Sequence, residues 1–275
     1  SILFILAVIS VACVVMITVF LVLEGGPAIY RVGIKDFLFG TNWQPTEAPA
    51  SYGILTFIMA SLYGTVGAIL IGVPIGILVA IGIAELAPPW LANLIRPAVN
   101  LLAGIPSVIY GFMVLVPFIS KVFGLAIGTN LLSAVIVLSI MVLPTIVSVS
   151  ETSIRAVPDA YMEASLALGV SKEHTIFYVL LPAAKSGIMA AVLLGIGRAI
   201  GEAMAVMMVS GNVPMMPTLL GPVRFLTTGI VAEMSYADGE HRNVLIGIGL
   251  ILFLFIMLIN TLFRYFLNKA GAQNE

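Results

Sequence analysis

An arginine and a glutamate lie inside one of the most apolar stretches of the chain. Arg198 and Glu202 fall within the run 187–209, which is long enough to cross a bilayer as a helix. Four residues apart, they would share one face of that helix. A charge at this depth costs roughly 2.5–3.5 kcal/mol, so it needs a partner or a water-filled cavity. Because a guanidinium can hold a tetrahedral oxyanion through two parallel hydrogen bonds, we expect this helix to line a path for an anion.

The same pair of residues also has a purely structural interpretation. Arg198 and Glu202 would then neutralise each other and would only help helices to pack. Charged residues within membrane spans are functional by default, which favours the anion path over this alternative.

A second polar signal lies in the sequence Gly104-Ile-Pro-Ser-Val-Ile-Tyr-Gly111. Pro106 with a glycine on either side predicts either a helix break or a simple kink. A break would leave backbone N–H groups free at the start of a half-helix, where the Ser107 hydroxyl could also donate to an anion. We therefore include Pro106 and Ser107 in the expected substrate path.

The overall composition is that of a membrane protein. The chain has 275 residues, of which 61% are hydrophobic and 9% charged, and its formal net charge is -1. Soluble domains are about 25% charged, so this chain is expected to be polytopic and to contact lipid. The near-neutral charge offers no basic surface for nucleic acid. A single cysteine and two separated histidines, His174 and His241, predict neither a disulfide nor a metal site.

Six apolar segments are near or above the length of about 20 residues that a helical span needs. They cover residues 2–23, 54–83, 98–119, 130–149, 187–209 and 243–266. The expected fold is therefore all-α and polytopic, with six transmembrane helices in a single domain over 1–275. The first segment is too long for a signal-peptide core, so we expect it to be retained, with a native start that is trimmed at Ser1.

The longest charged interruption, 151–185, separates the fourth and fifth apolar segments. Pro158 suits the first turn of a short helix, and Gly169 suits its C-terminal end. Ser171 can cap a second helix, which would stop at Pro182. A compact pair of helices between two spans predicts a docking element and not a flexible tether.

The docking element carries Glu163-Ala-Ser-Leu-Ala-Leu-Gly169, then nine residues, then Val179-Leu-Leu-Pro182. This pattern resembles the EAA signature of ABC importer permeases, with Val179 in place of the usual isoleucine. The resemblance implies the type I importer architecture, with a cytoplasmic coupling helix that sits in a groove of the ATPase subunit. The residues that it assigns to this contact are Glu163, Ala164, Gly169, Leu181 and Pro182.

Much of the chain between residues 36 and 266 also resembles the PstC family of phosphate importer permeases. The matching segments are Phe37–Pro45 with Trp43, Tyr52–Leu55, Ile83–Ala87, Gly104–Gly111, and Gly197–Val206 followed by Ser210-Gly-Asn212. The resemblance implies that Arg198 and Glu202 are needed for phosphate transport. Sulfate and molybdate permeases are the alternative family, but they usually follow the related Gly-Glu step with Phe-Gly, where this chain has Ala203-Met204.

The resemblance also implies the partners of an importer in the bacterial inner membrane. They are a homologous PstA-like permease subunit, two copies of a PstB-like ATPase and a periplasmic PstS-like phosphate-binding protein. No glycine directly precedes a lysine, so the chain has no Walker A motif. We therefore expect no cofactor and no enzymatic site in this chain, and ATP bound by the partner ATPase subunits. Six spans would place both termini inside.

Two chemical roles are open for Glu202. Arg198 would offer hydrogen phosphate a positive charge and a donor fork, while an ionised Glu202 would accept a hydrogen bond from the P–OH group. Sulfate is fully deprotonated near neutral pH and would meet that carboxylate as repulsion, which gives selectivity by rejection. In the other role, Glu202 holds Arg198 until the substrate arrives.

Two further function classes are disfavoured. An intramembrane hydrolase needs a nucleophile and a base at membrane depth, but both histidines lie outside the spans and no Gly-x-Ser-x-Gly occurs. A self-sufficient channel or carrier has no need of the docking element at 151–185. In the loop 210–242, Glu233, Asp238 and Glu240 are expected on a solvated face, with docking of a binding protein as the alternative.

Overall fold

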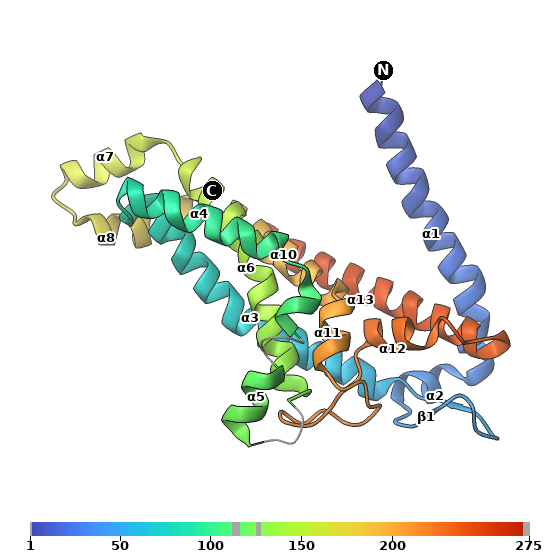
Figure 1. Ribbon diagram of the computed structural model, residues 1–275. Coiled ribbons are helices and arrows are strands. Elements are labelled where there is room, and N and C mark those ends of the chain that lie inside the picture. The colour runs from blue at the N-terminus through green and yellow to red at the C-terminus, as the bar shows by residue number, and fades with distance from the viewer. Residues whose placement is uncertain (1, 112–115, 125–127, 272–275) are drawn as a thin grey trace.

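The structure is a computed structural model that describes residues 2–111, 116–124 and 128–271. It consists of helices together with a hairpin of two short antiparallel strands, in which Trp43 pairs with Tyr52 (Figure 1). In chain order the elements are α1 (Ile2–Val32), α2 (Ile34–Phe39), β1 (Trp43–Gln44), β2 (Ser51–Tyr52), α3 (Leu55–Ile81), η1 (Gly82–Leu86), α4 (Pro89–Gly104), α5 (Val116–Phe123), α6 (Leu131–Arg155), α7 (Asp159–Ala167), α8 (Lys172–Thr175), η3 (Ile176–Leu180), α9 (Leu181–Ala183), α10 (Lys185–Gly201), α11 (Met204–Val209), α12 (Leu226–Glu233) and α13 (Gly239–Gly271). The elements η1 and η3 are π-helical turns.

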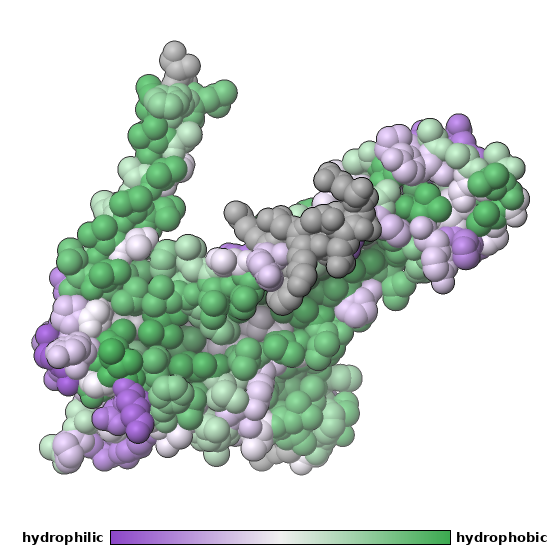
Figure 2. Space-filling view, turned by 180° about the vertical axis from the view of Figure 1, so that it is seen from behind, coloured by the Kyte–Doolittle hydropathy of each residue, from purple (hydrophilic) through white to green (hydrophobic). Residues whose placement is uncertain are grey.

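Several helices are suited to cross a bilayer. Within the described residues, four are long and apolar enough, and they cover Leu3–Val32, Leu55–Leu86, Leu131–Arg155 and Gly239–Leu262. Two bent helix pairs would raise this number to six. Figure 2 shows an apolar surface between two ends at which hydrophilic residues gather. An apolar belt with polar ends is what a bilayer requires, so the chain is a multi-pass membrane protein.

The two polar ends are built from different elements. We call the end formed by α7 and α8 the helix-pair end, and the end formed by α2, β1 and β2 the hairpin end (Figure 1). The helix α3 begins shortly after β2, and α6 ends shortly before α7. The helix α3 therefore starts at the hairpin end, and α6 leads into the helix-pair end.

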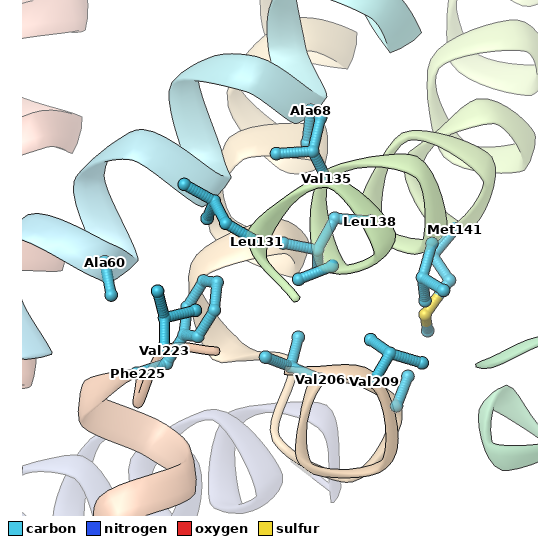
Figure 3. Packing of buried hydrophobic residues seen from close by; sticks show 13 residues of the cluster. Ala60, Ala68, Leu131, Val135, Leu138, Met141, Val206, Val209, Val223 and Phe225 are labelled. Atoms are coloured by element: carbon cyan, nitrogen blue, oxygen red, sulfur yellow. The ribbon is translucent and has the colours of Figure 1, made fainter. Parts of the chain in front are cut away.

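The central helix of the body is α6. In the most apolar stretch of α6, 61% of the residues are buried, against 22% in that of α13 and none in that of α1. It packs against α3, α10 and α11. Figure 3 shows part of this core, where Leu131 and Leu138 of α6 lie near Val206 and Val209 of α11. The core thus fixes α11 against the central helix.

Glycines allow α3 and α6 to approach closely. A Cβ atom at Gly72 would lie 2.6 Å from Val142 Cγ2, and one at Gly76 would lie 2.7 Å from Ile146 Cγ2. Real Cβ atoms do not come so near to other atoms, so a larger residue would push the helices apart. The glycine-rich sequence of this span therefore serves helix packing.

The first helix, α1, points away from the rest of the molecule over most of its length (Figure 1). It meets the body near Gly25, where a Cβ atom would lie 2.9 Å from the Gly247 Cα atom of α13. The helix continues to Val32, beyond the predicted segment 2–23.

Two of the predicted spans are not continuous helices. Segment 98–119 is interrupted because α4 ends at Gly104 and Ile105 is extended, with ψ 130°; its residues 112–115 lie outside the described chain. The helix α4 also begins early, at Pro89, since proline suits the first helical turn. Segment 187–209 is divided into α10 and α11. The other four segments correspond to α1, α3 with η1, α6 and α13.

Candidate functional site

The helix that carries Arg198 ends before it reaches Glu202. The last residue of α10 is Gly201, Glu202 is extended with φ -73° and ψ 122°, and α11 begins at Met204. The prediction of one continuous helix face that holds both charges is therefore wrong. A glycine at this point favours the break, because glycine loses more conformational entropy in a helix than other residues do.

Two donors hold the Glu202 carboxylate at the break. Its Oε1 atom accepts hydrogen bonds from the Ala205 backbone N–H at 3.0 Å and from the Ser107 hydroxyl at 3.3 Å. The first bond satisfies an N–H group in the first turn of α11, as a capping side chain does. The Glu202 carbonyl accepts from the Thr227 hydroxyl at 3.0 Å, which ties the break to α12.

Ser107 reaches Glu202 because α4 ends ahead of it. A new helical turn starts at Pro106, whose carbonyl accepts from the Ile109 N–H at 2.9 Å. Of the two alternatives at this proline, the structure therefore contains the break and not the simple kink. Pro106 itself is exposed, and Ser107 is half-buried. In this conformation the Ser107 hydroxyl, expected to face an anion, donates to a carboxylate.

The Arg198 guanidinium is exposed on α10. Its Nη1 atom lies 3.5 Å from the Thr145 hydroxyl of α6. No salt bridge joins Arg198 to a carboxylate within 4.0 Å anywhere in the described chain. The ion pair with Glu202 that the sequence allowed is thus not formed there, and a cationic group is left open at the side of the helix.

The helix-pair end has the local structure that the sequence predicted. Gly169 has φ 80°, a left-handed conformation that closes α7 and is unstrained only for glycine. The Ser171 hydroxyl caps α8 by accepting from the His174 N–H at 3.3 Å. Glu163 and Ala164 are exposed on α7, and Leu168, at its end, is 84% exposed. An apolar side chain at an exposed tip suits a docking contact.

The second helix of the pair ends at Ala183, one residue beyond the predicted stop at Pro182. The elements α8, η3 and α9 follow one another directly, and the chain then bends by 72° into α10. A π-helical turn precedes the proline, and such wider turns relieve the clash of a proline ring with the turn before it. Leu181 is half-buried and Pro182 is exposed.

Ionic contacts fasten the end of α6, next to the helix pair, to neighbouring helices. The Glu151 Oε1 atom, near the end of α6, accepts from Arg96 Nε at 2.7 Å and from Arg155 Nε at 3.0 Å. Arg155 also donates to the Ile83 carbonyl of η1 at 2.9 Å. Because Arg96 belongs to α4, a connected path runs from this end along α4 to the Ser107 break.

A buried polar cluster occupies the hairpin end. Glu233, predicted on a solvated face, is only 5% exposed, so that prediction is wrong for this residue. Its carboxylate accepts hydrogen bonds from Trp43 Nε1 at 3.1 Å and from the Arg224 guanidinium, and it pairs with His241 Nε2 at 2.8 Å. A tryptophan in a polar loop is the one sequence signal that could have pointed to this cluster.

The two other acidic residues of that loop do lie at the surface. Asp238 is exposed, and Glu240 pairs with Arg31 at 3.5 Å, with about half of each side chain accessible. Burial first, and the Glu240 carboxylate second, raise the pKa of the Tyr52 hydroxyl above its ordinary value. That hydroxyl therefore stays neutral at physiological pH.

The chain matches a known protein family over most of its length. Residues 72–270 match the family described as Binding-protein-dependent transport system inner membrane component. This stretch contains the Ser107 break, the helix pair, Arg198 and Glu202.

Individual relatives extend the match to nearly the whole chain. The "Probable ABC transporter permease protein YqgH" of Bacillus subtilis (strain 168) is 42% identical over 268 residues, which cover 93% of this chain and 87% of that protein. The "Phosphate transport system permease protein PstC" of Mesorhizobium japonicum is 34% identical over 86% of this chain and 80% of its own. The protein of that name from Pasteurella multocida is 33% identical over 86% of this chain and 81% of its own.

Solved structures share the fold. A chain of the MetNI methionine ABC transporter, in an inward-facing conformation, aligns with a TM-score of 0.59 and 20% identity over 79% of this chain and 94% of its own. A chain of an amino acid ABC transporter crystallised with histidines aligns with a TM-score of 0.58 and 19% identity. This alignment covers 78% of this chain and 92% of that one. At such identities the likeness concerns the fold alone.

Proposed function

Because the chain belongs to the family of binding-protein-dependent transport system inner membrane components, and is thus the permease subunit of an ABC importer, we propose that it moves inorganic phosphate. Relatives named PstC, which are 33–34% identical over most of the chain, support this substrate. The relative named only as an ABC transporter permease is neutral between substrates. The sulfate or molybdate importer is the alternative to be tested.

The observation that carries the proposal is the open guanidinium of Arg198. It is exposed on a helix of the apolar belt, and it has no carboxylate partner in the described chain. An unpaired cation at such a position is expensive unless it faces water or an anion. We assign Arg198 the role of holding phosphate through charge and paired N–H donors.

Glu202 is proposed to select against fully ionised anions. Both hydrogen bonds found for its carboxylate within the described residues end on Oε1, so Oε2 can accept a hydrogen bond from a P–OH group. Sulfate carries no such proton and would be repelled. The alternative role, in which Glu202 holds Arg198, has no supporting contact among the described residues. Ser107 and Pro106 would shape the same path, since Ser107 contacts Glu202 directly.

The partners follow from the family in part. An ABC importer permease works with an ATPase and a substrate-binding protein, and we propose that these are PstB-like and PstS-like, with a PstA-like second permease. The helix-pair end would face the cytoplasm and dock on the ATPase through Glu163, Ala164, Gly169, Leu181 and Pro182. The hairpin end would then face the binding protein. ATP, bound by the ATPase subunits, would drive alternating access.

Uptake by the reconstituted four-component complex tests the substrate. Proteoliposomes with ATP inside would receive a phosphate- or a sulfate-binding protein outside, each loaded with its labelled anion. We expect ATP-dependent uptake of phosphate and none of sulfate. Sulfate uptake without phosphate uptake would contradict the proposal and place the chain with the alternative family.

A further inference from the structure

The buried cluster at the hairpin end gathers residues from distant parts of the chain around one carboxylate. Trp43 of β1 donates to Glu233 of α12 across 190 residues of sequence. His241 of α13 pairs with the second carboxylate oxygen at 2.8 Å. Arg224, whose side chain is 14% exposed, completes the set of partners. A buried carboxylate with this many donors is satisfied, so Glu233 is a fixed point of the structure and not a free ligand site.

Arg224 connects this fixed point to α11. While its Nη1 atom contacts Glu233, its Nε atom donates to the Asn212 backbone carbonyl at 2.9 Å. Asn212 has φ 53°, a left-handed conformation that asparagine tolerates better than most residues. Its side-chain amide donates to the Met207 carbonyl of α11 at 2.7 Å. One guanidinium and one amide thus join Glu233 to the last turn of α11.

The opposite end of α11 carries the Glu202 contacts. The Glu202 carboxylate accepts from the Ala205 N–H in the first turn, and the helix is six residues long. A rigid helix this short transfers the position of one end directly to the other. Holding the carbonyl of Met207 therefore also sets where Glu202 lies relative to Ser107 and Arg198.

From this geometry we infer that Glu233, Arg224 and Asn212 are positioning residues that hold α11, and with it Glu202, from the hairpin end. This inference rests on the proposed function only in its link to phosphate uptake; the positioning of α11 does not depend on which substrate is moved. It gives a role to Trp43 and to the Ser210-Gly-Asn212 sequence, neither of which contacts the proposed substrate path directly. It also links the hairpin end, from which substrate would arrive, to the helix break inside the membrane.

The chain offers a matched comparison between two arginines. Arg224→Lys keeps the charge beside Glu233, but a single ammonium group is a point donor and does not reproduce the two-armed contact to Glu233 and Asn212. Arg31 pairs with Glu240 at 3.5 Å at the same end, with 52% and 53% of the side chains accessible, and so makes a surface contact. Arg31→Lys is therefore the control. Asn212→Asp breaks the next link, because a carboxylate cannot donate to the Met207 carbonyl.

A spin label at the start of α11 reads out its position without any substrate. Met204 is 49% exposed, and Cys13 is the single cysteine of this chain, so Met204→Cys in a Cys13→Ser chain gives one label site when the permease is labelled before the complex is assembled. We expect Arg224→Lys and Asn212→Asp each to increase the mobile component of the nitroxide spectrum by at least about twofold. Because the two links act in series, the double variant should add little to either single variant. The Arg31→Lys spectrum should match the parent.

Three results would overturn the inference. They are unchanged spectra in both variants, additive effects in the double variant, or an equal effect of Arg31→Lys. If Arg224→Lys fails to assemble, Asn212→Asp decides alone, because it leaves the Glu233 pair intact. Phosphate uptake measured on the same complexes should show a raised KM. A parent complex that moves no phosphate would contradict the proposed function, whereas the spectra would still test the positioning of α11.

Discussion

The hydroxyl of Ser107 donates to the carboxylate of Glu202 at 3.3 Å and joins two chain segments that each interrupt a helix. Ser107 follows the end of α4, and Glu202 separates α10 from α11. Irregular backbone at membrane depth is tolerated where it is buried in protein or lines a water-filled cavity. The two breaks meet at Glu202, four residues after the open Arg198, and the proposed phosphate path is built around this feature.

Removing the Ser107 hydroxyl should weaken transport without abolishing it. Ser107→Ala leaves Glu202 with the Ala205 N–H as its remaining partner among those described, so the carboxylate becomes less well positioned. Since a hydrogen bond to a charged group contributes about 1.5 kcal/mol, we expect the KM for phosphate to rise up to about tenfold. Initial uptake rates over a range of loaded binding protein would measure this. Ser107→Thr, which keeps a hydroxyl, should stay near wild type, and equal defects in both variants would argue for a packing role.

Neutralising Glu202 should relax the choice of anion. Glu202→Gln removes the negative charge but keeps an oxygen that accepts from Ala205 and Ser107. We expect phosphate uptake to fall. Sulfate, presented by a sulfate-binding protein, should itself be taken up by this variant when ATP is present. Continued rejection of sulfate by this variant would show that selectivity lies elsewhere, for example in the binding protein.

A methyl group at Gly76 should destabilise the bundle, whereas one at Gly82 should not. The Gly76 Cβ would lie 2.7 Å from Ile146 Cγ2, while nothing lies within 4 Å of the position at Gly82. Overpacking of this kind costs typically about 1–3 kcal/mol. Thermal unfolding in detergent should therefore show a lower Tm for Gly76→Ala and an unchanged or higher Tm for Gly82→Ala. Equal Tm values for the two variants would mean that α3 and α6 have room to separate.

A charge at the tip of the helix pair should weaken binding of the ATPase. Leu168 is 84% exposed and follows α7, so Leu168→Glu leaves the fold intact but places a carboxylate at the proposed contact. We expect the affinity of the ATPase subunit for the permease to fall at least about tenfold, measured by surface plasmon resonance with the permease immobilised. Leu219, 60% exposed in the loop between α11 and α12, gives the control Leu219→Glu, which should bind the ATPase normally. Undiminished binding by Leu168→Glu would move the contact to another surface.

The sequence was sufficient for features that depend on local rules. Gly169 closes α7, Ser171 caps α8, and four of the apolar segments correspond to long helices, because capping chemistry and span length are set by nearby residues. The helix pair was likewise predicted from its local capping residues, and the family was indicated by the resemblance of this one short segment to the EAA signature.

The sequence was insufficient where distant residues decide the structure. Glu233 was predicted on a solvated face, but its donor Trp43 lies 190 residues away in the sequence and packs over it. The break at Glu202 was predicted as continuous helix, since a run of apolar residues does not reveal that Ser107, 95 residues away, contacts the carboxylate there. In both cases a charged side chain is held by partners that no local pattern identifies.

The most direct test of the account is ATP-dependent phosphate uptake by complexes that carry Arg198→Ala or Arg198→Lys. If Arg198 holds phosphate through charge and paired donors, Arg198→Ala should lose at least about a hundredfold in uptake rate, as expected for a charged contact worth about 3 kcal/mol, and Arg198→Lys should recover only part of it. Both complexes should still assemble and hydrolyse ATP. Uptake by Arg198→Ala at the wild-type rate would contradict the account, because the open guanidinium would then have no part in moving the anion.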